Sequence, residues 1–284
     1  MNPVPFSGKT VLVTGASRGL GRHLAEAFWA AGADLFLVSR SAPQPLPPAA
    51  APAQRSTHLA IDLGAAEAPA RIFEALLPFS PTLDVVVNNA AIVGPMGPLE
   101  ENDWSQWEAA IRVNLLAPIA LCRLALARMK AQGRGVILNL SGGGATSPRP
   151  FFSAYATAKA GLVRFTETLA AEAGPHGIRA HAIAPGAMNT EMHQQVLRAG
   201  PALAGETEYR RAVEQAQRGG VPPSTAAELA VFLASDAAAA INGRLISAVW
   251  DSWKNLAAHA AELAASDVYT LRRIVPRERG FRWE

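Results

Sequence analysis

Short apolar runs alternate along this chain with longer stretches in which apolar residues recur every three or four positions. The short runs are rich in valine, isoleucine and leucine, which is typical of buried β-strands. They predict strands over residues 10–14, 34–39, 58–62, 84–88, 135–141, 178–184 and 244–250. The longer stretches predict helices over residues 19–31, 66–77, 103–131, 153–173 and 225–234.

The order of these elements indicates the architecture. Strands that are apolar on both faces and alternate with helices predict a parallel sheet covered by helices on both sides. We therefore expect a single doubly wound α/β domain over residues 1–250, with a parallel sheet of about seven strands. Five prolines between Pro43 and Pro52 predict an irregular loop after the second strand. Residues 251–284 form a C-terminal extension, in which 251–265 has an amphipathic helical pattern.

Composition narrows the class of protein. The chain has 284 residues, of which 50% are hydrophobic and 17% charged, and its formal net charge is +3. This weak, scattered charge predicts no nucleic-acid binding. The lone Cys122 lies in an apolar helical stretch and is expected to be a buried thiol. The six histidines lack metal-ligand spacing, so no metal site is expected.

The N-terminal segment has no basic stretch followed by an apolar core, and no uninterrupted apolar run approaches 18 residues. We therefore expect neither a signal peptide nor a membrane-spanning helix, and a cytoplasmic location.

A glycine-rich turn, "TGASRGLG" (14–21), follows the first predicted strand and opens the first predicted helix. Glycines at such a turn let a ligand approach the backbone, and the helix N-terminus offers free N–H groups to a pyrophosphate. The candidate cofactor-binding residues of this turn are Gly15, Ser17, Arg18, Gly19, Leu20 and Gly21.

Tyr155 and Lys159 are four positions apart in a predicted helix, so their side chains share one face. A tyrosine hydroxyl can donate a proton to a carbonyl oxygen, but its ordinary pKa is about 10. A nearby ammonium lowers that pKa, and Lys159 is the cation at hand. The pair is therefore a candidate acid–base site.

Five motifs together resemble the short-chain dehydrogenase/reductase family. They are the glycine turn at 14–21, "NNAA" (88–91), Asn114 in "VNL", Tyr155 with Lys159, and "PGAMNT" (185–190), and they span roughly residues 8–250. The resemblance implies a Rossmann-type domain, a nicotinamide cofactor, and hydride transfer between that cofactor and a carbonyl or alcohol.

The resemblance also assigns expected roles. Lys159 would hold the cofactor ribose, and Asn114 would anchor a water in the proton relay. Asp62 and Leu63 would border the adenine, and Asn89 and Ala90 would lie along the cofactor. Pro185, Gly186 and Thr190 would contact its nicotinamide end, and residues 188–222 would form a substrate lid. Pairing through helices 103–131 and 153–173 would give a homodimer or homotetramer.

Charge after the second strand indicates the cofactor preference. NAD enzymes usually carry an acidic residue there, which accepts hydrogen bonds from the ribose. This chain has Ser39 and Arg40 instead, and Arg18 in the glycine turn. Because guanidinium groups bind phosphate well, we expect NADP(H) to be preferred over NAD(H).

The catalytic serine of the family usually lies thirteen residues before the tyrosine. In this chain that position is Gly142, and Ser141 is one residue earlier. The glycines and prolines of the following loop tolerate an inserted residue, so we expect Ser141 to take the catalytic role. Ser153 is interpreted as a helix N-cap.

Three further features are given modest interpretations. Arg149 is expected to be a solvated loop residue, with contact to an anionic substrate as the alternative. His193 lies in the lid segment, and Trp104 and Trp107 are expected to serve packing. The C-terminal extension could cap the active site, pack on a second subunit or extend freely.

Three functions stay open at this point. The favoured one is an NADP(H)-dependent oxidoreductase acting on a small-molecule ketone or secondary alcohol. The alternatives are a non-catalytic NADP(H)-binding sensor and an epimerase or dehydratase acting on a nucleotide sugar.

Overall fold

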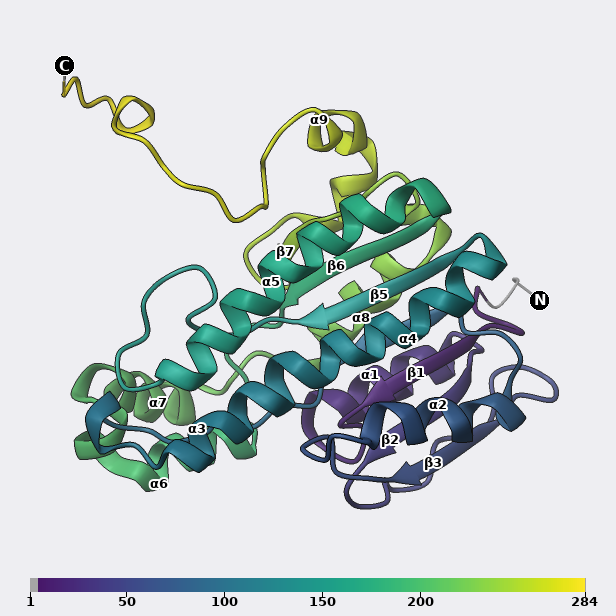
Figure 1. Cartoon of the computed structure of the whole chain (residues 1–284), viewed down its shortest axis with the longest axis horizontal. Coiled ribbons are helices and arrows are strands. Elements are labelled where there is room, and N and C mark those ends of the chain that lie inside the picture. Colours follow the sequence, from purple (N-terminus) through teal and green to yellow (C-terminus); the bar gives the residue numbers. More distant parts are fainter. Residues whose placement is uncertain (1–4, 284) are drawn as a thin grey trace.

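The computed structural model describes residues 5–283 and contains a seven-stranded, fully parallel sheet. The strand order is β3-β2-β1-β4-β5-β6-β7 (Figure 1). The strands are β1 (Thr10–Thr14), β2 (Asp34–Ser39), β3 (Ser56–Ala60), β4 (Val85–Asn88), β5 (Gly135–Leu140), β6 (Ile178–Ala184) and β7 (Leu245–Ser247). The expected doubly wound α/β fold is confirmed.

Helices cover both faces of the sheet (Figure 1). The chain has α1 (Gly19–Ala30), α2 (Ala68–Phe79), α3 (Trp104–Ile111), α4 (Ala117–Gln132), α5 (Ser153–Ala173), α6 (Glu191–Ala204), α7 (Glu206–Arg218), α8 (Pro223–Ala234) and α9 (Ala260–Ala264). Alternate strand residues point to opposite faces, so Val11 and Val13 pack with α1 and α8, whereas Leu12 packs with α2, α4 and α5.

The long helix predicted over 103–131 is interrupted. A π-helical segment, Arg112–Leu116, separates α3 from α4. The stretch Trp104–Gln132 is long and apolar enough to span a membrane by length and composition. In the structure, however, Leu121, Ala125 and Met129 of α4 are fully buried against the sheet, as in the core helix of an α/β domain.

The proline-rich loop after β2 forms neither helix nor strand over residues 41–55. Hydrogen bonds tie it to α1 instead. Trp29 Nε1 donates to the Pro47 carbonyl at 2.9 Å, and Gln54 Nε2 donates to the carbonyls of Trp29 and Ala33 at 2.8 and 2.9 Å. The loop is therefore irregular but anchored.

The final strand is shorter than predicted, because a side-chain turn ends it. Asp251 Oδ2 accepts a hydrogen bond from the Ser247 N–H at 2.6 Å, and Ser247 Oγ accepts from the N–H groups of Val249 and Trp250. These bonds fold residues 247–251 into a turn. The helix predicted over 251–265 is instead a 3₁₀ segment, Trp253–His259, followed by the short α9.

The beginning of the C-terminal extension completes the core. Trp253, Leu256 and Leu263 are buried with α1 and α8. The Leu245 N–H donates to the Tyr269 carbonyl at 2.8 Å, so the extension also covers the outer edge of β7. Beyond this contact, residues 272–283 extend away from the domain (Figure 1).

Candidate active site

The candidate residues gather where the parallel strands end at their carboxyl side. The glycine turn follows β1, Ser39 ends β2, Asn89 follows β4 and Ser141 follows β5. Figure 1 shows α6 and α7 beside α3 at the end toward which β5 points. Ligands of open α/β sheets bind at this edge, so the topology brings the predicted site together.

The glycine turn, called the glycine cradle below, is packed so closely on itself and on the segment after β4 that larger side chains would not fit. A Cβ atom built on Gly15, where φ is +68°, would lie 2.9 Å from Ala90 Cα, and one on Gly21 would collide with the Gly15 carbonyl. The N-cap residue Arg18 makes no side-chain cap to α1. The start of α1 therefore has no side-chain cap, and helix N–H groups of this kind suit a dinucleotide pyrophosphate.

The segment after β4 is pinned to this turn. Thr14 Oγ1 accepts hydrogen bonds from the N–H groups of Asn89 and Ala90 at 3.0 and 3.1 Å, and Asn89 Nδ2 donates to the Thr14 carbonyl at 2.9 Å. The structure therefore brings two of the expected cofactor contacts beside the glycine turn.

At the end of β2, Ser39 is buried, and its Oγ donates to the Ser41 carbonyl at 2.8 Å. Arg40 is exposed, as is Arg18 across the neighbouring strand end. Asp62 is exposed beside the buried Leu63, and its Oδ1 accepts from the Gly64 N–H at 2.8 Å. The position directly after β2 thus presents a cation where a carboxylate would bind ribose.

Tyr155 and Lys159 are both buried on α5. Lys159 Nζ donates to the Leu140 carbonyl at 2.7 Å and lies 5.8 Å from the centre of the Tyr155 ring. Burial lowers the pKa of Lys159 to about 8. Burial also raises the pKa of Tyr155, and the charge of Arg149 partly opposes that rise. The structure thus differs from the sequence expectation, in which Lys159 lowers the pKa of the phenol.

Asn114 is fully buried within the π-helical segment. Its Nδ2 donates to the Ile92 carbonyl at 2.7 Å, and its Oδ1 accepts from the Ile92 N–H at 2.9 Å. The side chain therefore joins the segment after β4 to the helix that carries it. Such π-helical turns are often found at functional sites.

The position beside the Tyr155 hydroxyl is Gly142. A Cβ atom built there would collide with Tyr155 Oη. Ser141 is buried one residue earlier, and its N–H donates to the Ile183 carbonyl at 2.8 Å. Its catalytic role stays a prediction.

The N-cap interpretation of Ser153 is wrong. Phe152 is the N-cap residue of α5, and Ser153 is the first residue of the helix. The Ser153 Oγ instead accepts a hydrogen bond from Trp107 Nε1 at 3.0 Å, and this bond holds α3 against α5.

The "PGAMNT" segment leads into residues 188–222, the lid expected from the family resemblance. Gly186 has φ of +88°, and a Cβ atom there would lie 2.6 Å from Val249 Cγ2. The Thr190 methyl group lies 3.8 Å from a Cβ built on Gly19, at the start of α1. Pro185 precedes this turn at the end of β6. The lid therefore starts close to the glycine cradle.

Arg149 is not a solvated loop residue. Its Nε donates to Glu208 Oε2 on α7 at 2.7 Å, and the exposed fractions of the two side chains are 22% and 18%. Glu208 could not be predicted as a site residue, because Arg149 lies 59 residues earlier in the chain and no local pattern links the two. His193 is buried, and its Nε2 bonds the Ala212 carbonyl at 2.8 Å.

The rings of Trp104 and Trp107 stack, with 4.9 Å between their centres. This contact agrees with the packing role expected for the two residues, although Trp104 remains 60% exposed.

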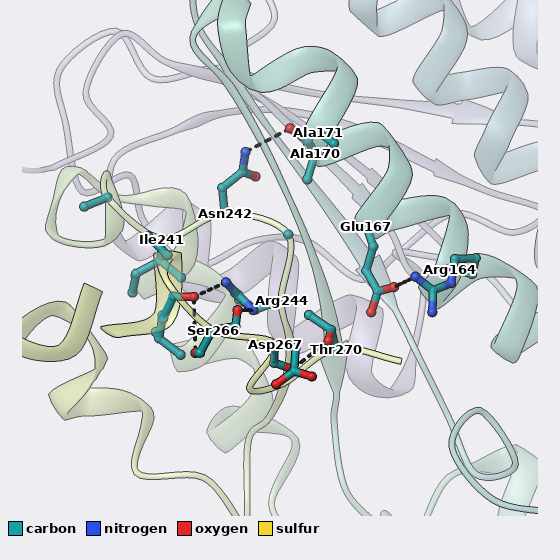
Figure 2. Close-up of a pocket in the computed structure, with 14 residues that line it drawn as sticks. Arg164, Glu167, Ala170, Ala171, Ile241, Asn242, Arg244, Ser266, Asp267 and Thr270 are labelled. Atoms are coloured by element: carbon teal, nitrogen blue, oxygen red, sulfur yellow. Dashed lines mark hydrogen bonds and ion pairs between the residues drawn. The ribbon is translucent and has the colours of Figure 1, made fainter. Parts of the chain in front are cut away.

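A cavity of about 560 Å³ lies elsewhere, between α5, the turn before β7 and the C-terminal extension (Figure 2). Arg164, Glu167, Asn242 and Arg244 line it with Asp267. None of the candidate site residues contributes to it. The cavity is therefore separate from the candidate site at the glycine cradle and Tyr155.

Comparisons with known proteins agree with the geometry. A family model described as short chain dehydrogenase matches residues 9–200. The chain is 35% identical over 243 residues to 3beta-hydroxysteroid dehydrogenase 1 of Eggerthella lenta, covering 84% of this chain and 91% of that protein.

Solved structures agree as well. A gluconate 5-dehydrogenase structure from Beutenbergia cavernae, with NADP bound at low occupancy, has a TM-score of 0.73 and 29% identity, covering 87% of this chain and 97% of that one. A levodione reductase has a TM-score of 0.76 and 27% identity, covering 89% of this chain and 99% of that one.

Proposed function

This chain belongs to the short-chain dehydrogenase/reductase family and is a nicotinamide-dependent oxidoreductase, and from that premise we propose its reaction. It transfers a hydride between NADP(H) and a ketone or secondary alcohol, with Tyr155 as acid and base. The observation that carries the proposal is the buried Tyr155–Lys159 pair on α5, at the same sheet edge as the glycine cradle. When bound, the nicotinamide ring supplies or accepts the hydride.

The side chains of the site account for the proton. In the reducing direction, the Tyr155 hydroxyl donates its proton to the carbonyl oxygen as the carbon gains the hydride, and the product is an alcohol. Burial opposes the phenolate that remains, and Lys159 Nζ lies 5.8 Å from the centre of its ring. Tyr155 is only 7% exposed, so little bulk water competes for the substrate oxygen. Asn114 holds the backbone of Ile92 at the same site.

The cofactor contacts follow from the cradle. The N–H groups at the start of α1 would hold the pyrophosphate, and Arg18 and Arg40 would bind a 2′-phosphate. Both arginines are exposed at adjacent strand ends, and no ion pair occupies either of them within residues 5–283. The charge of Arg18 does act on Glu191 of α6, whose pKa it helps to lower. The exposure of both cations supports a preference for NADP(H) over NAD(H).

Arg40→Ala is expected to weaken NADPH binding by roughly 10- to 150-fold, because a charge-assisted contact contributes about 1.5–3 kcal/mol. NADH affinity should change little, since NADH has no 2′-phosphate. Titration of cofactor fluorescence on the purified protein measures both. Arg71→Ala, an exposed arginine on α2, is the matched control. Equal losses for NADPH and NADH would contradict the phosphate assignment.

A turnover screen tests the reaction itself. NADPH oxidation is followed across a panel of ketones and NADP⁺ reduction across a panel of secondary alcohols, with cofactor affinity measured in parallel. The named substrates of the similar proteins are a hydroxysteroid, gluconate and levodione, so the panel includes steroids, sugar acids and small cyclic diketones. Tight cofactor binding without turnover would favour the sensor. Nucleotide sugars are tested separately by product analysis, because epimerisation and dehydration leave the amount of NADPH unchanged. Conversion of a nucleotide sugar without net NADPH consumption would favour the epimerase or dehydratase.

We also propose a cytoplasmic homodimer or homotetramer that pairs through the α3–α4 stretch and α5. Leu116 and Trp104 leave 48% and 60% of their surface exposed on this stretch. Light scattering at micromolar concentration should give the mass of a dimer or tetramer. A mass of one 29.9 kDa chain would contradict the prediction.

A further inference from the structure

The loop between β5 and α5 lies against the Tyr155 phenol and carries the guanidinium of Arg149 close to it. Gly142 faces the Tyr155 hydroxyl, and the guanidinium of Arg149 would lie 3.6–3.7 Å from a Cβ atom built on Gly143. Arg149 Cζ lies 3.9 Å from the centre of the Phe152 ring and 5.8 Å from the centre of the Tyr155 ring. Arg149 is therefore packed into the site, beside the phenol.

Arg149 and Lys159 stand at the same distance from Tyr155. Lys159 Nζ is also 5.8 Å from the ring centre, but it is directed at the Leu140 carbonyl. Its pKa of about 8 means that its charge is lost as the pH rises through that value. A guanidinium keeps its charge over this range, so it supplies a field that the lysine does not maintain.

The lid supplies the counter-charge. Glu208 on α7 accepts from Arg149 Nε at 2.7 Å and from Arg211 Nη1 at 3.0 Å. A carboxylate so close cancels part of the arginine field at the phenol. The effective charge that Tyr155 experiences therefore depends on where the lid holds Glu208.

Other titratable groups around Tyr155 are few among the described residues. The apolar cluster around its ring contains Val93, Phe152 and lid residues of α6 and α7. Tyr209 of α7 packs against this cluster, and His193 of α6 is buried with its Nε2 bonded to the Ala212 carbonyl. Besides Lys159, the charged pair at the phenol is Arg149 with Glu208.

We propose that Arg149 is a second positioning cation for Tyr155, which stabilises the phenolate, and that Glu208 couples this effect to the position of the lid. The inference rests on the proposed function, in which Tyr155 exchanges the proton. It is independent of whether Ser141 contacts the substrate.

The test is a phenolate titration of the cofactor-free chain, read by near-ultraviolet absorbance in a rapid pH jump before the protein unfolds. The chain contains three tyrosines, so the titration of the matching Tyr155→Phe protein is subtracted from each variant. The Tyr155 midpoint should rise in Arg149→Gln, return toward the parent value in Arg149→Lys, and fall in Glu208→Gln. Arg198→Gln, which breaks the lid ion pair with Glu191, should leave it unchanged.

An unchanged midpoint in Arg149→Gln would overturn the proposal. So would Arg149→Lys behaving like Arg149→Gln, since that would assign the arginine a packing role. If Arg149→Gln does not fold, Glu208→Gln decides, and a midpoint that does not fall overturns the proposal. The titration needs neither substrate nor cofactor, so its outcome is separable from a failed turnover screen. On a substrate that is turned over, Arg149→Gln should lower kcat at pH 7 about tenfold, with NADPH affinity kept.

Discussion

Replacing Tyr155 with phenylalanine is expected to lower kcat by about 10²–10⁴-fold, the usual contribution of a positioned proton donor. The phenyl ring fits the same apolar cluster with Val93 and Phe152, so the fold should be preserved. Steady-state kinetics on a substrate from the turnover screen gives kcat, and a fluorescence titration gives NADPH affinity. The expected result is a large loss of kcat with cofactor binding retained. Turnover at the parent rate would exclude Tyr155 as the acid.

Ser141→Ala provides the comparison. If Ser141 binds the reacting oxygen, its loss should lower kcat by at least about tenfold. For comparison, loss of a dedicated oxyanion donor usually lowers kcat by about 10²–10³-fold. The residue beside the Tyr155 hydroxyl is Gly142, which has no hydroxyl of its own. The Ser141→Ala result therefore shows whether the serine one residue earlier supplies that group. If Ser141→Ala matches the parent while Tyr155→Phe is inactive, the serine has no catalytic role.

Truncation after Asp251 is expected to abolish stable folding. Trp253, Leu256 and Leu263 would leave the core, and burial of each contributes about 1.5–3 kcal/mol. Their sum, about 5–9 kcal/mol, approaches the whole stability of a typical domain. In addition, Arg244 would lose its hydrogen bonds to the carbonyls of Leu263, Ser266 and Val268. Thermal unfolding followed by circular dichroism measures the effect.

The control is a chain that ends at Arg273. It keeps the bond from the Leu245 N–H to the Tyr269 carbonyl and the contact of Leu271 with Glu167. It removes only the segment that extends away from the domain, so its melting temperature should match that of the full chain. A folded protein truncated after Asp251 with an unchanged melting temperature would contradict the role of the extension in the core.

The central strands were predictable because they are apolar on both faces, whereas the partly exposed edge strand β3 begins two residues earlier than predicted. The boundaries of β1, β2 and β6 and of α5 are as the sequence pattern predicts. The end of β7 was not predictable, because the turn there depends on one carboxylate, Asp251, reaching a backbone N–H four residues earlier. The π-helical segment at Asn114 was missed for a similar reason. The segment carries a pair of hydrogen bonds between Asn114 and Ile92, 22 residues away, which no local pattern indicates.

For the candidate site, too, the motifs predict which residues come together but not every contact that they make. The motifs predicted that Tyr155, Lys159 and the glycine turn share one edge of the sheet. They could not predict that Lys159 is directed at the Leu140 carbonyl, or that Arg149 pairs with Glu208 on the lid. These contacts join elements far apart in the chain, and periodicity carries no information about them.

The two faces of the sheet would close at different times during synthesis. On the face covered by α2, α4 and α5, the last core residue in the chain is Ala180. The other face needs α8 and then Leu263, 83 residues later. At ribosomal rates of about 5–20 residues per second, that interval is about 4–17 s. During it, Phe28 and Trp29 of α1 have only part of their covering. A nascent chain paused in this interval offers chaperones an apolar surface that the finished protein conceals.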